Sequence, residues 1–370
     1  MNRENIRFNH QYTEKEKDEK MIRFYNDYSE GAHERIIEAM TRTNRDQFPG
    51  YGEDEICEEA KTLIRRHLRK PETAIHFLVG GTQTNTTVIA SVLKPYQGVI
   101  AAETGHIAAH ESGAIEATGH KVLTLPHTNG KISADQVERL IRAHYDSESF
   151  EHQVQPGMVY ISQPTEYGTI YSKAELEALH EVCRKFHIPL FIDGARLGTA
   201  LVCEGSDTTL ADLEELADVF YIGGTKMGAL FGEAVVISNP DLQHCFRYMI
   251  KQKGGMLAKG WLLGRQFAEL FRDDLYFDLA RHAVRLAQKM AAGIAELGYP
   301  FFLDSPTNQI FPIFPDELIH QLEDDFACSY WDWGRPDPQH SITRIVTSWA
   351  TEEKNVDAFL DALRKAGHRE

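Results

Sequence analysis

The sequence predicts an α/β protein with a large domain built on a mostly parallel sheet, followed by a smaller α+β domain. First, short apolar runs alternate with stretches of helical periodicity through the middle of the 370-residue chain, which is typical of a parallel sheet covered on both faces. Second, two of these runs lead into residues with ionisable side chains, the carboxylate of Asp193 and the amine of Lys226. Third, a long helical pattern begins after about residue 255. We therefore expect an N-terminal segment joining the small domain at 1–45, a large domain at 46–255, and a connecting helix with the small domain at 256–370.

The expected elements follow one another in the order that such a sheet requires. Apolar runs typical of strands lie at 75–79, 98–101, 121–125, 158–161, 189–192, 219–222 and 234–237. Helical periodicity lies between them at 82–93, 106–118, 134–145 and 173–186. Beyond the large domain we expect one continuous helical pattern at 261–297, strands near 309–313 and 343–346, and a final helix at 352–366. Ligands of such sheets bind at the carboxyl ends of the strands, where Asp193 and Lys226 fall.

Composition and charge describe an ordinary globular protein and exclude several classes of partner. The net charge of −16 argues against nucleic acid, whose phosphates would be repelled. No apolar run approaches the ~20 residues of a membrane-spanning helix, and the polar first 20 residues lack the apolar region of a signal peptide. Five cysteines without CxxC spacing favour reduced thiols over disulfides or zinc. We therefore expect a cytoplasmic protein with neither a nucleic-acid nor a membrane partner.

The two strand ends indicate a cofactor. Asp193 lies in the segment Phe-Ile-Asp-Gly-Ala-Arg at 191–196, and Lys226 ends the segment Tyr-Ile-Gly-Gly-Thr-Lys at 221–226. They suit pyridoxal 5′-phosphate, because a lysine forms an imine with its aldehyde and an aspartate keeps its ring nitrogen protonated as an electron sink. A structural carboxylate or a solvated lysine would explain either residue alone. The accompanying Arg196, the apolar strands and the glycines favour the cofactor site.

A candidate phosphate loop follows the first strand of the large domain, where the sequence reads Val-Gly-Gly-Thr-Gln-Thr-Asn at 79–85. The glycines let backbone N–H groups approach an anion, Thr82 offers a hydroxyl, and the N-terminus of the next helix adds partial positive charge. The pattern matches neither the dinucleotide fingerprint nor the P-loop. A plain strand-to-helix turn capped by Thr82 is the alternative, and the neighbouring cofactor residues favour the phosphate.

His106 and His110 follow the next strand, and their spacing would place both on one helix face, as in a metal pair. No third ligand follows nearby in the sequence and the HExxH order is absent, so we do not expect a metal site. His106 suits an aromatic platform stacked on the cofactor ring, and the alternative is that it only caps the helix. We interpret His110 as a surface residue.

Together these segments resemble the low-specificity L-threonine aldolase family, whose members are pyridoxal-phosphate enzymes and are also filed with the β-eliminating lyases. The resemblance extends over most of the chain. It is carried by the segments 21–27, 50–54, 81–83, 105–107 with Glu111 and Gly113, 193–196, 225–226 and 344–347. The resemblance implies the aspartate-aminotransferase fold (fold type I), with active sites shared between the subunits of a homodimer or homotetramer.

The resemblance also implies an activity, the cleavage of L-threonine, L-allo-threonine or a related β-hydroxy-α-amino acid to glycine and an aldehyde. The catalytic residues that we infer on this basis are Lys226, His106 and Glu166. The cofactor-binding residues are Gly81, Thr82, Gln83, His106, Asp193, Arg196, Thr225 and Lys226. The substrate-binding residues are Asn26, Tyr51, Arg196 and Arg344, of which the two arginines would bind the carboxylate as planar, bidentate groups.

Three positions depart from the family pattern. Glu166 stands where many members carry a second active-site histidine, so the candidates for the base are this glutamate, the platform histidine and a bound water. Asn26 replaces the family's opening serine, which weakens one carboxylate contact. Leu257 replaces an arginine that reaches the phosphate of the neighbouring subunit, and Lys253 or Lys259 are the candidates to serve instead.

Two other functions stay open at this point. The same fold supports β-elimination or transamination with the same cofactor, and elimination is distinguished by its products, ammonia and a keto acid. A non-catalytic cofactor-binding scaffold is the second alternative, but it would not need the lysine, the aspartate and both arginines together. Plain packing is the alternative for Tyr51, and a structural ion pair is the alternative for Arg344.

Overall fold

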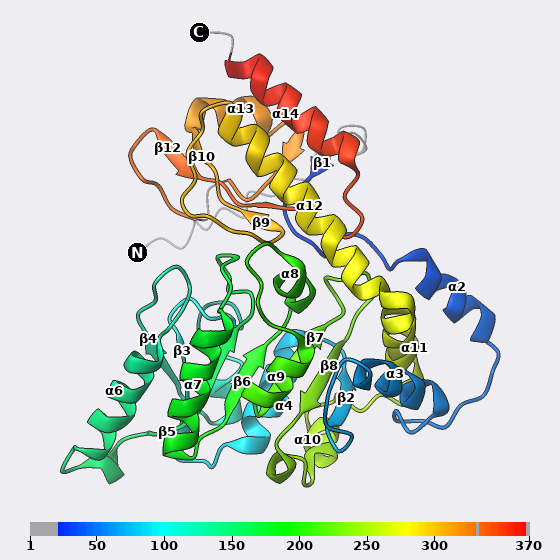
Figure 1. Ribbon diagram of the computed structural model, residues 1–370, viewed down its shortest axis with the longest axis vertical. Helices are drawn as coiled ribbons and strands as arrows, with labels where there is room; N and C mark the ends of the chain where they lie inside the picture. The colour runs from blue at the N-terminus through cyan, green and yellow to red at the C-terminus, as the bar shows by residue number, and fades with distance from the viewer. Residues whose placement is uncertain (1–20, 331–332, 368–370) are drawn as a thin grey trace, which may run out of the picture.

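The computed structural model describes residues 21–330 and 333–367 and contains a central sheet of seven strands (Figure 1). The strands are β2 (Ala74–Leu78), β3 (Gln97–Ala102), β4 (Val122–Leu125), β5 (Gln155–Ser162), β6 (Leu190–Asp193), β7 (Val219–Gly223) and β8 (Glu233–Ile237). Their order is β2-β8-β7-β6-β5-β3-β4. Neighbours from β7 to β4 are parallel, and β8 is antiparallel to both β7 and β2. The predicted α/β class with a mostly parallel sheet is confirmed.

Helices cover both faces of this sheet and bury them. One face is covered by three helices that each begin with a capping box, α6 (Ala134–Tyr145), α7 (Lys173–Phe186) and α9 (Leu210–Leu216). The other face is covered by α4 (Gly81–Val92) and α10 (Phe246–Gln252). Successive residues of β5 alternate between the two cores, since Val159 packs in the first and Tyr160 in the second. A strand with apolar residues on both faces is typical of a parallel sheet buried on both sides.

A smaller α+β part lies above the sheet in Figure 1, at the far end of α12 (Leu275–Glu296). Its other elements are β9 (Gln309–Ile310), β10 (Ile313–Pro315), α13 (Asp316–Leu322), β11 (Phe326–Ala327), β12 (His340–Ile342), β13 (Ile345–Val346) and α14 (Glu353–Gly367). These elements enclose a separate apolar core that includes Phe24, Phe314 and Phe359.

The N-terminal segment contacts both parts of the molecule. β1 (Ile22–Arg23) pairs in parallel with β11 of the small part, whereas α2 (Glu34–Thr43) packs on α11 (Trp261–Phe271). The domain limits at 45/46 and 255/256 stay a prediction, and residues 1–20 of the first segment lie outside the described residues.

The expectation of one continuous helix at 261–297 is wrong, because the chain breaks between α11 and α12 at Arg272–Asp274. Asp273 and Asp274 have φ angles of 56° and 57°, a left-handed conformation that aspartate adopts more readily than most residues. The break lets α11 pack on α3 (Glu55–Arg65) while α12 runs on to the small part. In the described part of the chain, no helix combines the length and apolarity that crossing a membrane requires.

The predicted helix at 106–118 is also shorter than expected. Only α5 (His106–Ala109) is helical, and a 3₁₀ turn follows at Glu116–Thr118. Between them Ser112 and Gly113 have positive φ angles of 51° and 73°, which ends the helix after one turn. This early end brings Glu111 back against the ring of His106.

Candidate active site

A cavity of about 630 Å³ lies at the carboxyl ends of the parallel strands, with walls from both the large and the small part. Five of the predicted site residues line it: His106, Glu166, Arg196, Lys226 and Arg344. They are separated by up to 238 positions in the chain, and the fold brings them together because β3, β5, β6 and β7 end at the same edge of the sheet.

Two of these strand ends come so close that only glycine fits between them. Asp193 is the last residue of β6 and Gly223 is the last residue of β7. A Cβ atom at Gly194 would overlap the carbonyl oxygen of Tyr221, and one at Gly223 would overlap that of Ala195. The glycines of both motifs therefore bring the aspartate next to the loop that carries the predicted lysine.

Asp193 is buried and its carboxylate accepts four hydrogen bonds. The donors are Tyr160 Oη at 2.6 Å and Asn85 Nδ2 at 3.1 Å to Oδ2, and Tyr221 Oη at 2.5 Å and Ala195 N at 3.0 Å to Oδ1. Burial acts to raise the pKa of this carboxyl, but the charge of His106 and the two tyrosine hydroxyls outweigh burial and lower the pKa. Asp193 is therefore ionised at neutral pH, which the partner of a protonated ring nitrogen must be.

Glu111 holds the imidazole of His106. Its Oε1 lies 2.7 Å from His106 Nδ1, and Asn85 Nδ2 donates to the same oxygen at 2.7 Å. Burial lowers the pKa of His106, but the bond to Glu111 and the charge of Asp193 raise the pKa on balance. The amide of Asn85 thus donates to both carboxylates that stabilise the imidazolium, Glu111 and Asp193.

Glu166 contributes another carboxyl group to the cavity. Its Oε1 accepts hydrogen bonds from Ser162 Oγ at 2.7 Å and from the backbone N–H of His106 at 2.9 Å. Burial raises the pKa of Glu166, and the charge of Asp193 acts in the same direction. A carboxyl with a raised pKa is a better proton acceptor than an ordinary surface glutamate.

Lys226 lies in the loop after β7, and the buried carboxyl group of Glu233 holds this loop in place through hydrogen bonds. Thr225 Oγ1 donates to Glu233 Oε1 at 3.0 Å, and the backbone N–H of Gly224 donates to Oε2 at 3.2 Å. Burial raises the pKa of Glu233 to about 8. Burial, followed by the cation of Arg196, lowers the pKa of Lys226. A lowered pKa increases the fraction of unprotonated amine, the form that attacks an aldehyde.

Arg196, one of the two predicted carboxylate ligands, is paired with Asp27. Arg196 Nε and Nη2 lie 2.6 and 3.0 Å from Asp27 Oδ2 and Oδ1. Burial acts to raise the pKa of Asp27, but the Arg196 cation outweighs it and lowers the pKa. The members of this pair are 169 positions apart, so no local motif in the sequence indicates it.

Arg344 is the less satisfied of the two arginines. Its Nη2 donates to the carbonyl of Tyr25 at 3.3 Å, and its guanidinium lies 5.2 Å from the centre of the Trp333 ring. Its buried Nε has no hydrogen-bond partner among the described residues. Burial, followed by the cation of Arg196, lowers its pKa. A bound carboxylate would supply both the missing acceptor and the missing negative charge.

The predicted phosphate loop forms the first turn of α4, and its residues lie outside the lining of the cavity. Gln83 Nε2 donates to the carbonyl of Lys253 at 3.2 Å, and Thr82 is exposed. The backbone N–H groups of this turn have no acceptor inside the helix and are the groups left for an anion. A Cβ at Gly81 would lie 3.1 Å from Tyr221 Oη, so the turn adjoins the hydrogen bonds around Asp193.

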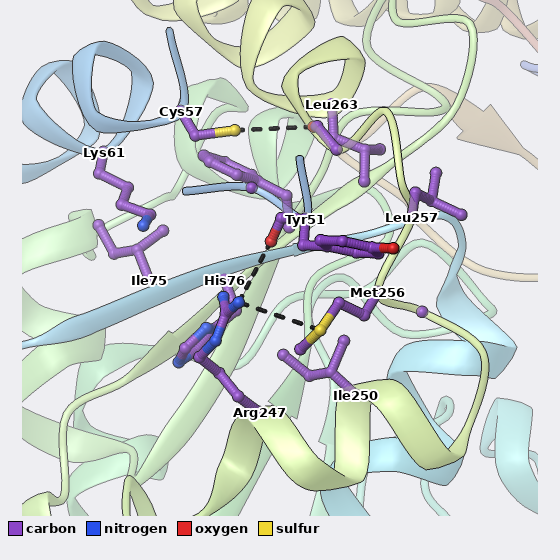
Figure 2. A pocket seen from close by; sticks show the side chains of 14 residues that line it. Tyr51, Cys57, Lys61, Ile75, His76, Arg247, Ile250, Met256, Leu257 and Leu263 are labelled. Atoms are coloured by element: carbon purple, nitrogen blue, oxygen red, sulfur yellow. Dashed lines mark hydrogen bonds between the residues drawn. The ribbon is translucent and has the colours of Figure 1, made fainter. Parts of the chain in front are cut away.

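The structure does not bring Asn26 or Tyr51 into the lining of this cavity. Asn26 Oδ1 accepts hydrogen bonds from the following turn, from Tyr28 N and Ser29 Oγ, both at 2.9 Å. Tyr51 lines a separate cavity of about 30 Å³ beside Arg247 (Figure 2). The roles of both residues as substrate contacts stay predictions.

The residues of the larger cavity fit pyridoxal phosphate. They offer the amine of Lys226, whose pKa is lowered, the aromatic imidazole of His106 and the guanidinium of Arg344, whose Nε has no partner among the described residues. Asn85 Oδ1, Glu111 Oε2 and Arg344 Nε are buried and have no partner among the described residues, so polar groups remain for a ligand to satisfy. Asp193, buried and with a lowered pKa, supplies the negative charge that a protonated ring nitrogen requires.

Several residues of this arrangement escaped sequence analysis. Tyr160 and Tyr221 read only as members of apolar strands, although the alternation along a strand does place both on one face. Asn85 lies one helical turn after Gly81, a spacing that points it toward the same site. Glu233 opens the strand after the lysine loop, and no signal in the sequence linked it to Thr225.

Comparisons with known proteins agree with this geometry. A model of the beta-eliminating lyase family matches residues 27–316. The low specificity L-threonine aldolase of Pseudomonas aeruginosa is 30% identical over 329 residues, which are 88% of this chain and 92% of that protein. The solved threonine aldolase of Leishmania major is 44% identical, with a TM-score of 0.90 over 94% of this chain and 99% of that one. An aspartate aminotransferase of Thermus thermophilus, 16% identical with a TM-score of 0.67 over 94% of this chain and 91% of that one, shares the fold.

These matches confirm both the predicted fold type and the resemblance that the motifs indicated. The family model covers most of the chain, from Asp27 to the start of α13, and the matched region includes the strand ends that carry Asp193 and Lys226. The chain belongs to the beta-eliminating lyase family.

Proposed function

We propose that this protein is a pyridoxal-phosphate-dependent lyase that cleaves the Cα–Cβ bond of L-threonine, L-allo-threonine or a related β-hydroxy-α-amino acid to glycine and an aldehyde. The names of the relatives from Pseudomonas and Leishmania support the reaction. The observation that carries the proposal is the combination, in one cavity, of the Lys226 amine with the incompletely satisfied guanidinium of Arg344.

When bound, the cofactor would supply an aldehyde carbon and an electron-withdrawing ring. Lys226 would hold it covalently, Asp193 would pair with the ring nitrogen, and His106 would lie against the ring face. The backbone N–H groups of Gly81, Thr82 and Gln83 would bind the phosphate. Thr225 would fix the lysine loop through its hydrogen bond to Glu233.

The substrate carboxylate would bind Arg344, with Arg196 contributing the edge of its guanidinium that Asp27 does not occupy. We assign proton removal from the β-hydroxyl to Glu166. Its raised pKa supports this role, whereas the raised pKa of His106 favours the imidazolium, which cannot accept a proton. His106 would then serve mainly as the platform.

The assembly and location of the protein are proposed with the same reasoning. We infer a homodimer or homotetramer with shared active sites from the family resemblance, and the position of Tyr51, which lines a cavity other than that of Lys226 in its own chain, supports this. The buried and unpaired state of Cys57, Cys183, Cys203 and Cys328 supports a cytoplasmic location, where thiols stay reduced.

The direct experiment is a product assay on the purified protein loaded with pyridoxal phosphate. We expect equimolar glycine and acetaldehyde from L-threonine and L-allo-threonine, and glycine with benzaldehyde from phenylserine. Release of ammonia and a keto acid without glycine would instead support β-elimination. A Lys226→Ala variant is the control: it should be inactive, and borohydride should fix no cofactor to it. Covalent fixation at another lysine would contradict the assignment of Lys226.

A further inference from the structure

Asp27 is completely buried, and its carboxylate accepts three hydrogen bonds. Two come from Arg196, which pairs with it side-on through Nε and Nη2. The third comes from Asn308, whose Nδ2 lies 2.9 Å from Asp27 Oδ2. A buried carboxylate with three donors is held in one position, and so is the guanidinium that it faces.

Asn308 is itself fixed within the small part. Its Nδ2 also donates to the backbone carbonyl of Thr347 at 2.8 Å, and the backbone carbonyl of Asn308 accepts from Thr347 N at 3.0 Å. The chain just before Asp27 is held in the same way, since Val346 N donates to the carbonyl of Phe24 at 2.8 Å. Asp27 is therefore anchored to the part of the molecule that also carries Arg344, while Arg196 follows a strand of the large part.

The pairing leaves one side of Arg196 available. A guanidinium has five N–H donors in a planar fork, and Asp27 uses the Nε–H and one Nη2–H. The second Nη2–H and both Nη1–H groups remain. Because Arg196 is one of the residues that line the cavity with Arg344, these remaining donors are the ones that a ligand in the cavity can reach.

The surroundings of Arg196 make its position depend on Asp27. Lys226 and Arg344 are both close enough that the cation of Arg196 lowers their pKa values, after the effect of burial. Without a counter-charge, Arg196 would be repelled by both of these cations and would turn away from them. Asp27 removes this repulsion and also fixes the direction in which the guanidinium points.

We propose that Asp27, held by Asn308, is a positioning residue that presents the free edge of Arg196 to the carboxylate of the substrate, next to Arg344. This inference rests on the proposed function, since the carboxylate is that of the amino acid. It assigns to the N-terminal segment a role in substrate recognition and not only in folding.

The test compares ligands with and without a carboxylate on the holoenzyme. The dissociation constants of glycine and of glycinamide are measured by titration of the cofactor absorbance. In Asp27→Asn we expect the Kd of glycine to rise about 30-fold, the lower end of the cost of breaking a buried, hydrogen-bonded charge pair. The Kd of glycinamide should stay unchanged. The KM for threonine should rise more than kcat falls.

The controls separate positioning from stability. Asp212 lies in the first turn of α9, and its buried carboxylate pairs with Lys173. Asp212→Asn removes this carboxylate and should leave both dissociation constants unchanged. Asn308→Ser should also raise the Kd of glycine, but by less than Asp27→Asn does. It replaces Asp27→Asn as the test variant if that protein does not fold. In an Arg196→Ala background, Asp27→Asn should add little further loss.

Three results would overturn the proposal. Unchanged glycine binding in Asp27→Asn would leave Asp27 without a role in recognition. Equal loss for glycine and glycinamide would indicate general damage to the site. Tighter glycine binding would mean that Asp27 only neutralises the charge of Arg196 and does not position it for the substrate. Failure of the proposed function is distinguishable, because it would appear as a wild-type holoenzyme that binds glycine but releases none from threonine.

Discussion

At the scale of single residues, Asp193 suits its four donors because both of its carboxylate oxygens accept hydrogen bonds. An amide in its place would present an NH₂ group to hydroxyl and amide donors that now point at an oxygen. Asp193→Asn therefore loses the negative charge and also leaves buried donors unpaired. We expect kcat for threonine cleavage to fall on the order of 10²-fold or more.

The matched control for this prediction is Tyr160→Phe. It removes one of the four donors but keeps the charge, so kcat should fall much less and the cofactor absorbance should stay close to that of the wild type. Steady-state kinetics and visible spectra measure both. An Asp193→Asn enzyme with normal rate and cofactor affinity would contradict the pairing of this residue with the ring nitrogen.

The pH dependence of the reaction tests Glu166. Its pKa is raised by burial and by Asp193, and only its ionised form accepts a proton. Activity should therefore be lost as the pH falls through this raised pKa, at a pH above the ordinary glutamate range. In Glu166→Gln the acidic limb of the kcat profile should disappear and the rate should be low throughout, while the cofactor spectrum is kept. A profile of unchanged shape would exclude Glu166 as the base.

Residues that act through a local motif could be predicted from the sequence, and residues that act through a distant partner could not. Asp193 and Lys226 each stand at the end of an apolar run with glycine nearby. A segment of six residues is therefore enough to indicate that each lies at the end of a buried strand. Asp27 has no such signal: its pairing with Arg196 and Asn308 exists only after the N-terminal segment has crossed to the small part. The roles of Asn26 and Tyr51 rest on family resemblance alone.

At the scale of elements, the packing of α11 on α3 depends on a glycine. A Cβ at Gly264 would lie 2.6 to 2.9 Å from Sγ, Cα and N of Cys57, and the backbone atoms of α3 cannot yield without moving the helix. Gly264→Ala should therefore cost about 1–3 kcal/mol of stability through overpacking, more than the roughly 1 kcal/mol by which alanine favours a helix over glycine.

Gly293→Ala in α12 is the comparison. There the three atoms nearest to the new methyl group all belong to the side chain of Leu360, which can change rotamer. Thermal unfolding of both variants measures the difference, and the midpoint should fall clearly more for Gly264→Ala. Equal midpoints would mean that α3 is free to shift away from α11.

Sequence periodicity located the elements but not the breaks within them. The helices at 134–145 and 173–186 have the predicted limits, because a capping serine marks each start. The breaks near Ser112 and at Asp273 include left-handed residues that are not glycine, although Gly113 accompanies Ser112 in the first. Such residues adopt this conformation when tertiary packing demands it, and helical periodicity continues across them unchanged.

At the scale of the whole molecule, exposed aromatic side chains indicate where a second copy would bind. Tyr248 of α10 is 77% exposed and Tyr51 is 47% exposed, and Lys251 Nζ lies 4.9 Å from the centre of the Tyr51 ring. Aromatic rings of this kind are enriched in the cores of protein interfaces. The surface formed by Tyr51, Tyr248 and Lys251 is therefore our candidate for the subunit contact.

We expect the wild-type protein to sediment as a dimer or a larger assembly, and Tyr248→Glu to shift it toward the monomer, because the substitution would bury a charge in the contact. Sedimentation velocity at micromolar concentration measures this. The exposed Tyr145, on the far end of the sheet from the cavity, offers a control: Tyr145→Glu should leave the assembly unchanged. A wild-type monomer would contradict the proposed subunit contact.

The hydrogen bond between Asn308 and Asp27 has a consequence for the nascent chain on the ribosome. The two residues are 281 positions apart, so at about 5–20 residues per second Asp27 emerges roughly 15–60 s before its partner. The sheet with Asp193 and Lys226 is complete by β8, and it can form while the rest is still being translated. Arg344 and Asn308 arrive last. A chain released early would therefore keep Arg196 and the residues proposed for the cofactor, but it would lack Arg344, the second arginine proposed for the substrate carboxylate, and translation itself would delay turnover until the polypeptide is nearly finished.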